Sequence, residues 1–129
     1  MTQWTPELEA LIRRYSEYHD EQMRDALNPT TSAEDTLLRM DFRHESYGKR
    51  IYTKICAAMN MDASSPYNDT YEKNMQQMVD LAAQNGSDAA DKLKKVLDVG
   101  RQILGDRKDP PSRDPVENIR RAKLKNIQY

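Results

Sequence analysis

Residues 5–29 read TPELEALIRRYSEYHDEQMRDALNP, and this stretch decides the fold class. Thr5 and Pro6 signal the start of a helix, because a threonine oxygen caps unpaired amide groups and proline fits the first helical position. Asn28 and Pro29 end it, since proline cannot continue a helix. Between these signals, apolar and ring-bearing side chains recur every three or four positions, at Leu8, Leu11, Ile12, Tyr15, His19, Met23, Ala26 and Leu27. The spacing predicts one long amphipathic helix.

Three further helices are predicted by the same pattern, each bounded by a polar cap or a glycine. They run from the Thr31–Glu34 capping box to about Asn60, from just after Asp69 or Thr70 to Asn85-Gly86, and from Ser87 to Gly105. The loop after the first helix is short, so the second helix is expected to run antiparallel to the first. We therefore predict an all-α fold in which residues 1–105 form an antiparallel helical bundle of four helices.

Composition agrees with a single helical domain. The chain has 129 residues, of which 32% are charged and 37% hydrophobic, as in amphipathic helices around one core. One cysteine and the lack of a secretory leader favour a cytoplasmic protein, and no apolar run is long enough to span a bilayer. No phosphate-binding loop or paired-cysteine metal motif occurs, so the sequence predicts no cofactor and no metal.

The C-terminal region has a different composition from the rest. Residues 106–115 are rich in proline and predict an extended linker, and residues 116–129 predict a short basic helix, or arm. The basic side chains of this C-terminal region are Arg113, Arg120, Arg121, Lys123 and Lys125. Two interpretations stay open: these residues bind a partner, or the apolar residues between them pack back on the bundle while the basic groups remain solvated.

A polar layer is predicted inside the first hairpin. The second helix is expected to bury Leu37, Leu38, Ile51, Tyr52, Ile55, Cys56 and Met59, and at about 100° per residue the centre of that face falls on Leu37, Asp41, His44, Gly48 and Ile55. Antiparallel pairing then sets His19 opposite Asp41, and Tyr15 opposite His44 or Glu45. Gly48 is expected to permit a close approach between helices.

This layer of Tyr15, His19, Asp41 and His44 has three interpretations. It is a hydrogen-bonded layer that fixes helix register, a face toward a cleft or a partner, or a metal or catalytic site. We expect the first, because the third and fourth predicted helices offer no additional inward histidine or carboxylate to complete a metal site.

Three functional hypotheses follow. The leading one is a small non-enzymatic protein-interaction module, such as an adaptor, inhibitor or assembly factor, which docks through the bundle surface and the basic arm. The alternative is a nucleic-acid-associated regulator that uses the arm and the surface of Arg39, Arg43, Lys49 and Arg50, although a net charge of −1 is unusual for that class. A second alternative is a metal-dependent enzyme at His19, Asp41 and His44. The sequence determines neither the partner nor the oligomeric state.

Overall fold

The computed structural model describes residues 2–64, 69–104 and 114–129, and the described part of the chain is all-helical. The elements are α1 (Pro6–Leu27), α2 (Ala33–Arg43), the π-helical segment η1 (His44–Gly48), α3 (Lys49–Met59), α4 (Asp69–Gln84), α5 (Ala89–Leu104) and α6 (Pro115–Leu124). The prediction of an all-α fold is confirmed. No helix in these ranges combines the length and the apolarity that a membrane crossing requires.

The helix-start signals act largely as the sequence indicates. The Thr5 hydroxyl accepts a hydrogen bond from the Leu8 amide at 3.1 Å, and Pro6 is the first residue of α1. At the end of α4, Gly86 adopts the left-handed conformation (φ 71°), which costs a glycine nothing. The start of α2 differs from the prediction, because Ser32 caps it by accepting from the Asp35 amide, and the Thr31–Glu34 capping box does not form.

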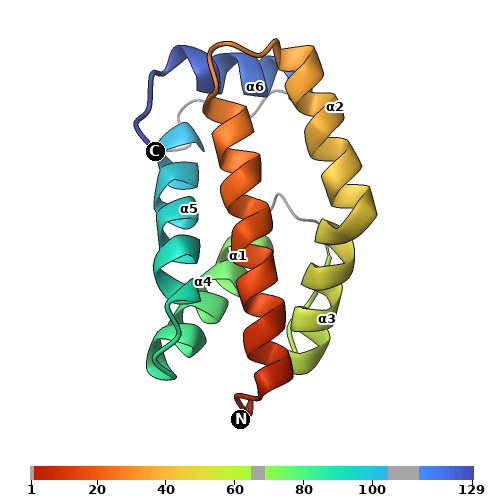
Figure 1. Cartoon of the computed structure of the whole chain (residues 1–129), viewed down its shortest axis with the longest axis vertical. Helices are drawn as coiled ribbons and strands as arrows, with labels where there is room; N and C mark the ends of the chain where they lie inside the picture. Colours follow the sequence, from red (N-terminus) through yellow and green to blue (C-terminus); the bar gives the residue numbers. More distant parts are fainter. Residues whose placement is uncertain (1, 65–68, 105–113) are drawn as a thin grey trace.

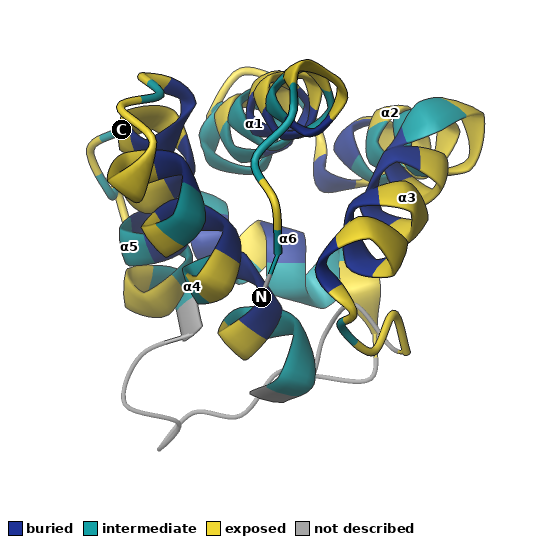
Figure 2. Ribbon diagram, turned by 90° about the horizontal axis from the view of Figure 1, so that it is seen from below, coloured by how far each residue is buried: buried dark blue, intermediate teal, exposed yellow. Residues whose placement is uncertain are grey.

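Helix α1 is the centre of the fold and contacts each of the other five α-helices. Seen along α1, the α4–α5 pair lies on one side of α1 and the α2–α3 pair lies on the other (Figure 2). The predicted four-helix antiparallel bundle is not confirmed as such. The main core joins α1, α3, α4 and α5, with Ile12, Ile55 and Leu93 fully buried at its centre.

The predicted second helix is divided by η1. A π-helical turn holds an extra residue, so the face that points inward shifts by about one position across it. In α2 the buried residues are Ala33 and Thr36, and Leu38 is 68% exposed instead of buried. No residue of α2 belongs to the main core.

The C-terminal helix α6 lies across one end of α1 and α2 (Figure 1). Ile119 and Ala122 are buried there. Of the two interpretations of residues 116–129, this packing matches the one in which apolar residues return to the fold. Most of the predicted 106–115 linker, and the Gly105 helix stop, lie outside the described residues.

Gly48 permits a close approach, but to a ring of α1. A Cβ on Gly48 would lie 2.6 Å from Cε1 and 2.8 Å from the hydroxyl of Tyr18, far inside van der Waals contact. From the sequence, the helical wheel places Gly48 near Ile12, whereas in the structure the Tyr18 ring of α1 lies against Gly48.

Gly48→Ala is expected to destabilise the protein by about 1–3 kcal/mol, because the added methyl group must displace the Tyr18 ring. Gly100→Ala is the matched control: its Cβ would meet only the Met23 methyl group at 4.0 Å, so it should stabilise α5 by about 0.5–1 kcal/mol. Urea unfolding of both variants measures the difference. Equal effects of the two substitutions would contradict the close approach at Gly48.

Candidate functional site

The predicted polar layer forms only in part, and with a different partner. The Tyr71 hydroxyl of α4 makes a short hydrogen bond with His19 Nε2 and lies 3.1 Å from the Tyr15 hydroxyl. The His19 ring also makes an edge contact with Tyr15, at 4.5 Å between centroids. Tyr15 and His19 are therefore joined through Tyr71, a residue that the sequence analysis did not select.

Asp41 lies outside this layer, which corrects the prediction. Its side chain is exposed on α2, because the register shift at η1 turns it away from α1. His44 is half-buried and accepts or donates a long hydrogen bond, 3.4 Å, between Nδ1 and the Tyr18 hydroxyl. His19, Asp41 and His44 thus do not converge, and residues 2–64, 69–104 and 114–129 contain no group of three His, Cys, Asp or Glu that could hold a metal ion.

Burial governs the ionisation of the ring cluster. It lowers the pKa of His19 to about 3, and the nearby His44 lowers that pKa further. Burial likewise raises the pKa of Tyr15 well above its ordinary value. Both side chains are neutral near pH 7, so the layer is a neutral hydrogen-bonded one.

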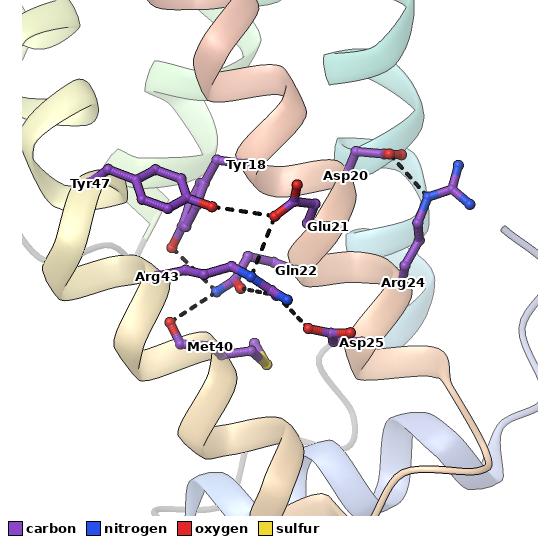
Figure 3. Close-up of polar contacts among 9 residues, drawn as sticks. All are labelled: Tyr18, Asp20, Glu21, Gln22, Arg24, Asp25, Met40, Arg43 and Tyr47. Atoms are coloured by element: carbon purple, nitrogen blue, oxygen red, sulfur yellow. Dashed lines mark hydrogen bonds and ion pairs between the residues drawn. The ribbon is translucent and has the colours of Figure 1, made fainter.

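A second polar network, which the sequence did not reveal, joins α2 to α1 (Figure 3). The buried Gln22 amide donates to the Tyr18 hydroxyl at 3.3 Å and to the Met40 carbonyl at 3.4 Å. From the α2 side, the Arg43 guanidinium donates to the Gln22 carbonyl oxygen at 3.2 Å and pairs closely with Asp25. Hydrogen bonds and ion pairs therefore attach α2 to α1.

This attachment leaves two large apolar side chains of α2 in solvent. Leu38 is 68% exposed and Phe42, the only phenylalanine in the chain, is 72% exposed. They lie four residues apart and so form one ridge along the helix. We call Leu38 and Phe42 the α2 ridge. Apolar side chains that remain in solvent do not stabilise the folded chain, and adjacent ones often mark a surface that binds a partner. The α2 ridge is therefore the candidate functional site.

A sequence signal for the ridge exists. Leu37 and Leu38 are neighbours and differ by about 100° around a helix, so both cannot lie at the centre of one inner face. Phe42 follows Leu38 by four residues, on a stripe separate from that of Thr36 and Met40. The wheel drawn through an unbroken helix instead placed Leu37 and Leu38 on one buried face.

The basic residues of the C-terminal region mostly contact the protein itself. The Lys123 ammonium group donates to the carbonyl oxygens of Asp25, at 2.9 Å, and of Asn28, at the end of α1. Lys125 donates to the Ile103 carbonyl near the end of α5. These carbonyl groups carry the negative end of each helix dipole, so the two lysines act as C-terminal caps.

The arginines of this region are paired with carboxylates. Arg120 pairs with Glu34 of α2 and with Glu117, each at 2.9 Å, and Arg121 lies 3.6 Å from Glu117. Arg113 lies outside the described residues. Whether this set binds a partner stays a prediction, although Lys123 and Lys125 would have to give up backbone hydrogen bonds to do so.

Of the four basic residues proposed to bind nucleic acid, one is not available on the surface. Arg43 is half-buried between Asp25 and Glu21, whereas Arg39, Lys49 and Arg50 are exposed. The pairing of Arg43 with two carboxylates cancels its charge locally.

Comparisons with known proteins give no guide to the function. No protein-family model matches the chain, and neither a curated protein nor a solved structure matches it. The functional argument therefore depends on the geometry of the fold.

Proposed function

We propose that this protein is a protein-interaction module, an adaptor, inhibitor or assembly factor, and that it docks on another protein through the α2 ridge. The observation that carries the proposal is the exposure of Leu38 and Phe42 at 68% and 72%. An aromatic and an aliphatic side chain on adjacent turns are typical of the anchors that dominate protein interfaces.

The attachment of α2 supports this assignment. Helix α2 adds no residue to the main core, and its hold on α1 comes from Gln22, Arg43 and Asp25. A helix fixed by directional polar contacts presents its outer side chains in a defined orientation, and preorganisation of this kind reduces the entropic cost of binding.

The ridge fits a protein better than a nucleic acid. Phosphate groups are bound by cations, and the Arg43 cation of α2 is already paired with Asp25 and Glu21. The contacts at α6 point the same way, because Lys123 and Lys125 donate to backbone carbonyl groups. We therefore place the docking contact on the α2 ridge and give the basic arm a secondary role.

Photo-crosslinking tests the proposal. A benzophenone side chain at position 42 should form a protein adduct in a native lysate, and unlabelled wild-type protein in excess should suppress it. Position 124 is the matched control, since Leu124 is 80% exposed but lies on α6. The adduct at position 42 should survive nuclease treatment and disappear in Leu38→Ser.

The opposite results would overturn the proposal. Equal labelling from positions 42 and 124, or an adduct at position 42 that persists in Leu38→Ser, would show that the ridge does not select a partner. An adduct removed by nuclease would favour the nucleic-acid alternative.

A further inference from the structure

The α2 ridge is bordered by carboxylates on both sides. Asp35, Asp41 and Glu45 are exposed, and no ion pair or side-chain hydrogen bond joins their carboxylates to another residue in the described ranges. At about 100° per residue, all three lie within about 60° of Leu38 around the helix axis. We call these three residues the acidic rim.

The rim carboxylates make no tertiary ion pair within residues 2–64, 69–104 and 114–129, although Asp35 lies in the first turn of α2, where a negative charge favours the helix dipole. Glu34, one turn before Leu38, differs because it pairs with Arg120 of α6 at 2.9 Å. Elsewhere on the surface, carboxylates such as Glu9 and Asp88 share Arg13. Three carboxylates without a side-chain partner therefore lie beside two exposed apolar side chains on the continuous α2–η1 segment.

We propose that the α2 ridge and the acidic rim together bind an amphipathic helix of another protein whose apolar stripe is flanked by lysine or arginine. This inference rests on the proposed function and names its partner class. The Leu38–Phe42 row is an i, i+4 ridge, which packs into the groove between side-chain rows of a second helix. The rim carboxylates then pair with basic residues on both sides of the partner's stripe.

Charge excludes the other occupants of this face. A second copy related by a two-fold axis would set Asp35, Asp41 and Glu45 against the same residues, which is unfavourable for like charges. Nucleic-acid phosphates and anionic lipid headgroups would be repelled by the same carboxylates. The exposed cations that adjoin the rim are Arg39 on α2 and Lys49, four residues after Glu45, so the three carboxylates outnumber them.

The test uses the full chain and two synthetic helical peptides of equal length. Both peptides carry the same leucine stripe, flanked by lysine in one and by glutamate in the other. Titration followed by amide NMR of the protein should show shifts at residues 34–46, with at least about tenfold tighter binding of the lysine peptide at low salt. Circular dichroism checks that each protein variant is folded.

Three variants assign the effect. Asp41→Lys/Glu45→Lys should lose the preference for the lysine peptide, and Leu38→Ser/Phe42→Ser should lose binding of both peptides. Glu17→Lys/Asp80→Lys, which makes the same change in net charge on α1 and α4, should bind as the wild type does.

The outcomes separate this inference from the proposed function. Equal binding of both peptides, lost in Leu38→Ser/Phe42→Ser, would keep the ridge as a docking site and overturn the basic partner. The inference would be overturned if the peptide shifted only other residues, or if millimolar lysine peptide caused no shifts. If the shifts were unchanged in Leu38→Ser/Phe42→Ser, the ridge would also be excluded as the docking site. Concentration-dependent shifts at residues 34–46 without peptide would assign the face to a second copy.

Discussion

Removal of residues 114–129 is expected to lower the free energy of unfolding by about 3–5 kcal/mol. Burial of Ile119 alone contributes about 2 kcal/mol, and each hydrogen bond of Lys123 or Lys125 to a helix-end carbonyl group adds about 1 kcal/mol. The Pro-rich composition of residues 106–115 favours a separable arm. The contacts of α6 favour a loss of stability instead.

The end of the chain adds to this expectation. The Tyr129 hydroxyl donates to Asp20 of α1 at 2.6 Å, and the Tyr129 ring stacks against the Lys95 ammonium group of α5, 4.2 Å from its centroid. Burial raises the pKa of Tyr129 well above its ordinary value, and Asp20 raises it further, so the phenol keeps its proton. The last residue thus links α1 to α5.

Urea unfolding of residues 1–113 against the full chain measures the effect through the midpoint and the slope. Arg120→Ala is the matched control, because it removes only exposed ion pairs and should cost less than about 1 kcal/mol. A fragment that unfolds at the same midpoint as the full chain would show that residues 114–129 are independent of the rest.

Acid is expected to destabilise the fold through His19. Burial lowers the pKa of His19 in the folded protein to about 3, and an unfolded histidine has a pKa near 6.5. Above pH 6.5 the ring is neutral in both states and the full stability is present. As the pH falls below 6.5, the unfolded chain binds a proton that the folded chain does not, so stability is lost toward pH 3.

The expected loss is about 2 kcal/mol between pH 6.5 and pH 5, where most carboxylates are still ionised. The rings that contact His19 belong to Tyr15, Tyr18 and Tyr71. These are neutral phenols, so they do not compensate for the loss of stability in acid. His19→Gln should therefore flatten the dependence of the unfolding free energy on pH between 5 and 7.

His44→Gln is the control for this prediction. It removes the other histidine and leaves the surroundings of the half-buried His19 otherwise unchanged, so most of the acid sensitivity should persist. If His19→Gln and the wild type lose stability equally between pH 7 and pH 5, another group causes the acid sensitivity.

The helices themselves could be predicted from local sequence. The start of α1 at Pro6 and the left-handed Gly86 follow from caps and turn residues, which act within a few positions of the chain. The apolar spacing of α1 likewise identified Leu8, Ile12 and Tyr15 as buried, because helical periodicity is a local property.

The candidate site could not be predicted in this way. The π-helical segment η1 shifts the inward face of α2 by one position, so Asp41 and Leu38 are exposed where the wheel buries them. The extra residue is held where Gly48 receives the Tyr18 ring, a contact between residues 30 positions apart. Tyr71 joined the layer of Tyr15 and His19 for a similar reason, since α4 is placed by packing and not by its neighbours in sequence.

The sequence by itself determined that this chain is helical, where most helices begin and end, and that Leu8, Ile12 and Tyr15 of α1 are buried. These features depend on backbone hydrogen bonds, caps and apolar spacing, all of which act over one or two turns. Only the tertiary structure decided which face of α2 meets solvent and that Lys123 and Lys125 cap other helices. Those features depend on contacts between distant segments, and one extra residue in η1 is enough to exchange a buried face for an exposed one.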